Sequence, residues 1–226
     1  VYVLLNDHDK SLEVLKSLSM IDTSFGGTID LSLSDLYLQK KDTQLYYHHL
    51  IRGFKSRTLS SSIKIEKFIP ILTTLEDSVH DFDVIFQLAR SLVSVHPRES
   101  MSNYIYAEIL NQCNFIDSSV VYYKRSLMIS QDNQQAWTSM MFLQLQLKRY
   151  DSLIKYSEIA LELYPTNPII YYVSALSFYN IKKHQNAIES INNGINFVVQ
   201  NPSLKTEMYS LLAEIYNAIE DFQKSD

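Results

Sequence analysis

The sequence has little of what disulfide-bonded, all-β or membrane-spanning proteins need. Its 226 residues include one cysteine, four glycines and five prolines. A single cysteine excludes an intramolecular disulfide, and so few glycines and prolines argue against an all-β chain with many tight turns. No apolar run reaches the roughly 18 residues that a membrane-spanning helix needs. We therefore expect Cys113 to be a half-buried structural thiol.

Basic blocks are also lacking, since Lys and Arg total 20 against 25 Asp and Glu, with a net charge of −5. Electrostatic capture of nucleic acid or of an anionic membrane is therefore not expected. The sequence contains no HExxH, no Cys/His cluster with zinc spacing, no Gly-rich phosphate loop and no GxSxG. His48 and His49 point about 100° apart on a helix, so we interpret them as surface or groove histidines. We predict no catalytic residue, no cofactor, no metal site and no enzymatic activity.

What the sequence does contain is an internal repeat. Amphipathic segments end near Pro97, Gln131 and Pro165, and both separations are 34 residues (131 − 97 and 165 − 131). Residues 134–167 show the plan: two segments with apolar residues at helical spacing, joined by a short polar turn. A period of 34 residues is typical of helix–turn–helix arrays, so the spacing predicts an all-α fold.

The residues at fixed positions of this repeat extend the prediction. Trp137, Met140 and Met141 stand on the first segment of residues 134–167, and Ala160 and Pro165 stand on the second. With five units in register, the chain resembles the tetratricopeptide repeat (TPR) family, and in particular long multi-repeat bacterial TPR proteins, some of which are exported. The resemblance implies a right-handed α-solenoid of helix–turn–helix repeats.

We expect a single TPR array over residues 1–226. Small residues are expected where helices cross, at Ala107, Ala160, Ala175, Gly194 and Ala213. Tyrosines are expected at packing positions, among them Tyr106, Tyr123, Tyr171, Tyr209 and Tyr216. The expected repeats are a partial one at 1–25, complete ones at 27–60, 66–99, 100–133, 134–167 and 168–205, and a truncated one at 206–226, whose second helix would begin near Phe222.

Both ends fall in mid-repeat, which favours a fragment of a longer array. The chain begins at Val1, so its N-terminus reads as truncated, and both a cytoplasmic and an exported or periplasmic location stay open.

In TPR proteins the first helix of each repeat lines a concave groove. The groove positions of this sequence are apolar or aromatic in the central repeats, and Glu207 and Glu214 make the rim acidic. Apart from Lys67, these positions carry almost no positive charge, so we expect no clamp for a carboxylate. The resemblance implies a protein–protein interaction scaffold whose groove takes an apolar or basic partner peptide, or a helix, through Tyr104, Phe142, Leu145, Ile169, Tyr172, Leu176 and Tyr179.

Other interpretations stay open. Neighbouring repeats could cover the groove residues. The chain could be the helical regulatory region of a larger enzyme, or a structural array that self-associates through its cut ends.

Overall fold

The computed structural model describes residues 8–21, 25–73 and 82–225, and expectations that fall on other residues lie outside this part. Its regular structure is helical and the chain divides into two compact units, residues 1–129 and 130–226, each described by itself. Unit 1 holds α1 (His8–Ile21), α2 (Gly26–Gln39), α3 (Thr43–Lys55), α4 (Ser61–Thr73), α5 (Phe82–Val95), α6 (Ser100–Gln112) and α7 (Ile116–Ile129). Unit 2 holds α8 (Gln134–Gln146), α9 (Tyr150–Leu163), α10 (Pro168–Asn180), α11 (His184–Ile195) and α12 (Pro202–Ser225).

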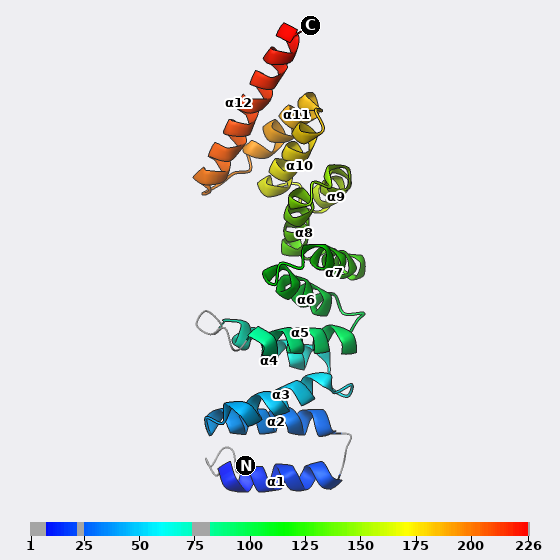
Figure 1. Cartoon of the computed structure of the whole chain (residues 1–226), viewed down its shortest axis with the longest axis vertical. Coiled ribbons are helices and arrows are strands. Elements are labelled where there is room, and N and C mark those ends of the chain that lie inside the picture. The colour runs from blue at the N-terminus through cyan, green and yellow to red at the C-terminus, as the bar shows by residue number, and fades with distance from the viewer. Residues whose placement is uncertain (1–7, 22–24, 74–81, 226) are drawn as a thin grey trace. The chain divides into compact units, whose positions relative to one another are not determined.

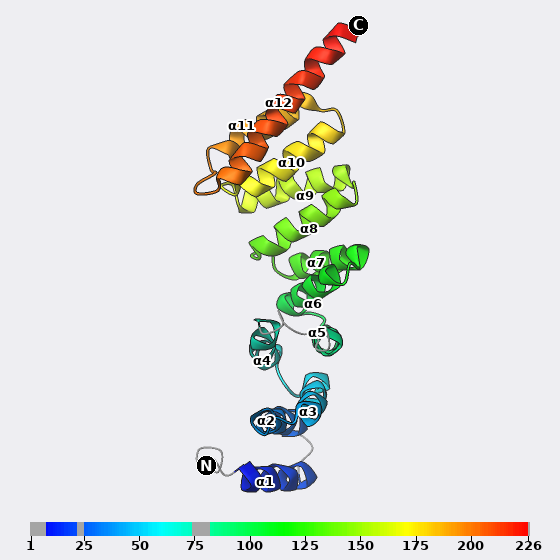
Figure 2. The same cartoon turned by 60° about the vertical axis from the view of Figure 1, so that its left-hand side comes forward.

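Consecutive helices pack in pairs, and successive pairs pack on one another within each unit. In unit 1, α2 packs on α3 and α6 on α7, while α5 joins α3 to α6. In unit 2, α8 packs on α9 and α10 on α11 (Figures 1 and 2). The first helices α8, α10 and α12 also contact one another in sequence, since α10 packs on both α8 and α12. The predicted repeat boundaries and the prediction of a single array stay predictions.

The turn inside four of these pairs has the same backbone geometry. A residue with φ near +60° follows the first helix each time: Lys41, Asn114, Lys148 and Lys182. The amide after it donates to a carbonyl five residues back, as Arg149 does to Gln144 at 2.9 Å. This is the Schellman ending of a helix, here built without glycine. Asn114, Lys148 and Lys182 are 34 residues apart, so the turn recurs with the period seen in the sequence.

Small and aromatic residues fill the core of unit 2 as the repeat pattern predicts. Ala160 and Ala175 are fully buried, and Trp137 is 3% exposed and donates its Nε1–H to the Gln131 carbonyl at 3.0 Å. Gly194 on α11 lies directly against Tyr171 on α10, where a side chain has no room. Close approach at such crossings lets apolar surface be buried on both helices.

The last helix departs from the prediction. A turn was expected before Phe222, but α12 continues from Pro202 to Ser225 without interruption. In the described part no second helix therefore packs on the face where burial was predicted. Tyr209 is 54% exposed, Tyr216 is 49% exposed, and Ala213 is also exposed. The predicted packing roles of these three residues are wrong, whereas Tyr106 and Tyr123 are buried.

Candidate functional site

The seven predicted groove residues are divided between the two units. Tyr104 lies on α6 of unit 1, and the others lie on α8 and α10 of unit 2. In unit 2, four of them pack against the apolar cluster formed by α10, α11 and α12: Ile169, Tyr172, Leu176 and Tyr179. Phe142 on α8 is 44% exposed and Leu145 is half-buried. We use the name first-helix face for these six predicted groove residues of α8 and α10 together with the neighbouring helix α12.

Tyr172 on α10 forms a hydrogen bond that connects α10 to α12 within this face. Its ring is half-buried, and its hydroxyl donates a hydrogen bond to the carboxylate of Glu207. Burial raises the pKa of Tyr172, and the negative charges of Glu207 and Glu214 raise it further, because they oppose ionisation of the phenol. One hydroxyl of α10 therefore lies within the electrostatic reach of two carboxylates of α12.

The charge of the first-helix face comes from α12. Residues Gln134–Gln146 of α8 and Pro168–Asn180 of α10 include no Asp, Glu, Lys or Arg. On α12, Glu207 and Glu214 are exposed. They are seven residues apart, which is about two helical turns, so both side chains lie on the same side of the helix. The face thus combines uncharged aromatic surface with a pair of carboxylates.

Tyr179 occupies the far end of α10. Its ring lies 5.9 Å from the ring of His184 at the start of α11, with the two planes inclined at 54°. The Nδ1 atom of His184 is buried and has no hydrogen-bond partner in the described part of the chain. Tyr179 is therefore held by packing near the turn of its own helix pair.

Tyr104 also lies beside a glutamate in unit 1, but the carboxylate of that glutamate, Glu108, already accepts a hydrogen bond from a second tyrosine. Glu108 accepts a hydrogen bond of 2.5 Å from the Tyr123 hydroxyl and also bonds the Tyr104 hydroxyl. Burial, together with Glu108, raises the pKa of Tyr104 to about 12. Since Tyr104 belongs to the other unit, it is not part of the first-helix face of unit 2.

Lys67 is the exceptional cation at a groove position on α4. Its Nζ lies 2.5 Å from a carboxylate oxygen of Asp35 on α2. The ammonium group is therefore neutralised within unit 1.

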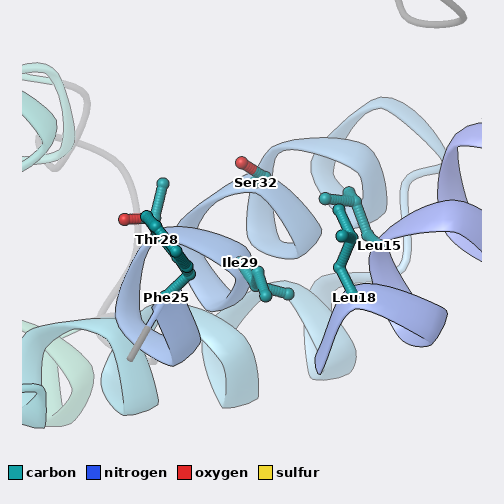
Figure 3. A pocket seen from close by; sticks show the side chains of 6 residues that line it. All are labelled: Leu15, Leu18, Phe25, Thr28, Ile29 and Ser32. Atoms are coloured by element: carbon teal, nitrogen blue, oxygen red, sulfur yellow. The ribbon is translucent and has the colours of Figure 1, made fainter. Parts of the chain in front are cut away.

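Two cavities of unit 1 have linings that include none of the seven predicted groove residues. One, of about 210 Å³, lies between α1 and α2 and has an apolar lining (Figure 3). The other, of about 300 Å³, is lined in part by a polar cluster: an Asp30 carboxylate oxygen lies 2.8 Å from His49 Nδ1, and Asp30 forms an ion pair with Arg52 Nε at 3.3 Å. His49 is thus a half-buried partner of Asp30, which corrects its interpretation as a surface or groove histidine. The lining of the first cavity is Leu15, Leu18, Phe25, Thr28, Ile29 and Ser32.

A buried lysine was also missed by the sequence analysis. Lys64 on α4 is fully buried, and its Nζ donates to the Ser56 carbonyl at 2.6 Å and lies 3.0 Å from His96 Nε2. Burial lowers the pKa of Lys64 to about 8, and burial followed by the Lys64 charge lowers the pKa of His96. Glu99 acts on His96 in the opposite direction. These contacts link the α3–α4 loop to the end of α5, which is a structural role.

Neither a metal-binding cluster nor a membrane-spanning helix is found among the described residues. Within residues 8–21, 25–73 and 82–225, no three His, Cys, Asp or Glu side chains are placed to hold a metal. Across the same ranges, no helix combines the length and apolarity required to cross a bilayer. Cys113 is half-buried as expected, and burial raises the pKa of its thiol.

Comparison with known proteins gives no family and no curated relative. No family model matches the chain, and no curated protein matches it. Solved structures do match. A crystal structure of MamA has a TM-score of 0.58 at 10% identity, covering 76% of this chain and 92% of that one. MamA residues 41 to the end from Desulfovibrio magneticus RS-1 has a TM-score of 0.55 at 11% identity, covering 74% and 96%.

The first TPR domain of human RPAP3 also matches, with a TM-score of 0.49 at 14% identity, over 57% of this chain and 99% of that domain. At these identities the likeness to the MamA structures concerns the fold. Together with the helix pairs and their recurring turn, it confirms the fold class predicted from the sequence. The chain is an all-α solenoid with TPR-like helical repeats.

Proposed function

We propose that the chain is a protein–protein interaction scaffold, without catalysis of its own, that binds a partner peptide or helix on the first-helix face of unit 2. The observation that carries the proposal is the exposure of aromatic surface on helices without charge. Phe142 is 44% exposed on α8, and Tyr172 and Tyr179 are half-buried on the neighbouring α10. Exposed apolar surface of this kind marks contact sites in many proteins, and amphipathic helices and extended peptides bind to such helical surfaces.

The fold supports the same proposal. In a solenoid each helix pair contacts only its neighbours, so a continuous surface of successive first helices is available to a partner. Here α10 contacts both α8 and α12, and these contacts support a surface shared by the three helices within unit 2.

A pull-down with a matched control tests this proposal. The test variant is Phe142→Ala/Tyr172→Ala/Tyr179→Ala. The control is Ile159→Ala/Leu163→Ala, which truncates side chains 40% and 43% exposed on the second helix α9. Both are checked for folding by circular dichroism, and proteins retained from a lysate of the source cell are identified by mass spectrometry.

We expect a partner that the wild type and the α9 variant retain and the triple variant loses. Equal retention by all three proteins would contradict the proposal. Self-association stays a separate prediction, which light scattering over a concentration series tests.

A further inference from the structure

We propose that the first-helix face of unit 2 binds a lysine or arginine side chain of its partner, held by Glu207 and Glu214 beside the ring of Tyr172. This inference rests on the proposed function and specifies the chemistry of the partner: a cationic residue flanked by apolar ones.

The two carboxylates lack a cation of their own. In the described part of unit 2, neither Glu207 nor Glu214 forms an ion pair. The packed helices α8 and α10 supply no basic residue, as their sequences contain none. Two exposed carboxylates on the same side of α12 therefore create a negative potential that nothing on α8 or α10 neutralises.

These carboxylates lie next to an aromatic side chain. Helix α10 packs on α12, and the Tyr172 hydroxyl is hydrogen-bonded to Glu207 and close enough to Glu214 to respond to its charge. A cation that reaches these carboxylates therefore also comes close to the Tyr172 side chain. Charge-assisted hydrogen bonds to the carboxylates and attraction to the aromatic ring favour the same ligand group, an ammonium or guanidinium.

The surrounding surface favours a partner in which apolar residues stand next to the basic residue. Leu176 and Tyr179 follow Tyr172 along α10, and both are half-buried. An acidic segment would be repelled by the carboxylates. A neutral polar segment would form weaker hydrogen bonds with them than a cation does, and would still desolvate this apolar surface. A segment with a basic residue and apolar flanks complements both parts of the face.

Unit 1 provides an internal control. Glu108 also lies beside a tyrosine at a first-helix position, but it already accepts a hydrogen bond from Tyr123 at 2.5 Å. Glu108→Gln removes one negative charge without changing the first-helix face of unit 2. The test variant Glu207→Gln/Glu214→Gln keeps the size of both side chains and removes only their charge.

The experiment selects random 12-residue peptides displayed on phage against the full chain. The most enriched peptide is then synthesised and titrated by calorimetry into the wild type and both variants. We expect enriched peptides to carry lysine or arginine next to apolar residues. We expect Glu207→Gln/Glu214→Gln to weaken binding about 10- to 100-fold, the range for hydrogen bonds between charged groups, with Glu108→Gln at wild-type affinity.

Each alternative outcome is decisive. Enriched peptides without basic residues, or peptides bound equally well by Glu207→Gln/Glu214→Gln, would overturn this inference and leave the proposed function intact. An equal loss of affinity in Glu108→Gln would show general attraction to an acidic protein and would overturn it too. If no peptide is enriched over an uncoated surface, the proposed function fails, and this inference fails with it.

Discussion

The crossing of α10 and α11 at Gly194 gives a sharp test of the packing. A Cβ atom at Gly194 would overlap the Cβ of Tyr171 and lie 2.7 Å from its Cγ. Carbon atoms in contact are normally about 3.5–4.0 Å apart, so the helices would have to separate by about 1 Å. The Tyr171 ring cannot easily move away, because it stacks on Phe197 at 6.0 Å and its hydroxyl donates to the Pro165 carbonyl at 3.0 Å.

Gly194→Ala has two opposing effects on stability. Over-packing of this severity costs about 3 kcal/mol, the upper end of the usual range. Alanine recovers at most about 1 kcal/mol relative to glycine, because that value holds for a helix interior and Gly194 lies in the last turn of α11. The free energy of unfolding should therefore fall by about 2–3 kcal/mol.

Urea denaturation measures this change through the fluorescence of the single tryptophan, Trp137, which lies in the same unit as Gly194. Gly26→Ala is the matched control, because a Cβ there meets no atom within 4 Å. The control, followed by circular dichroism, should show no loss of stability. A Gly194→Ala protein as stable as the wild type would refute the close crossing of α10 and α11.

Three further predictions concern stability. Trp137→Ala should lower the free energy of unfolding by about 3–5 kcal/mol, since the ring is buried; an unchanged thermal melt would contradict its core position. Gln144→Leu should stabilise the protein by about 1–2 kcal/mol, because the side-chain oxygen and nitrogen of Gln144 are both buried and have no hydrogen-bond partner in the described part of the chain. A lower melting temperature of this variant would contradict the burial of an unpaired Gln144 amide. Burial lowers the pKa of Lys64 from 10.5 to about 8, so between pH 8 and pH 10.5 Lys64 binds a proton more strongly in the unfolded chain than in the folded chain. The stability of the wild type relative to Lys64→Met should therefore rise from pH 8 to pH 10.5, and a constant difference across urea titrations would contradict the burial of a charged Lys64.

The 34-residue period of the sequence predicted the fold, because the spacing of apolar and small residues reflects which side chains are buried between helices. Trp137, Ala160 and Ala175 are buried where the repeat requires them. The start of a second helix near Phe222 was predicted wrongly, because the repeat pattern was extended over residues that contain no turn signal. The stretch around Phe222 lacks an Asn or Lys at the position where Asn114 takes a positive φ, so the helix continues.

The resemblance assigned residues to the candidate site by their repeat positions, but it could not predict which side chains contact one another. The resemblance assigned Tyr172 to a groove position and Glu207 to the rim, yet only the packing of α10 on α12 brings the hydroxyl and the carboxylate together. Lys64 could not be found from the sequence, because a lysine at helical spacing normally indicates a solvated face. Its burial depends on the carbonyl of Ser56 and the ring of His96, which come from other segments.

The most direct test of the central proposal is amide hydrogen exchange of the full chain with and without the selected peptide. The account predicts slower exchange on binding in α10 and α12, around Tyr172 and Glu207, with α9 unchanged. Protection confined to second helices, or to the cavities of unit 1, would contradict a binding role for the first-helix face.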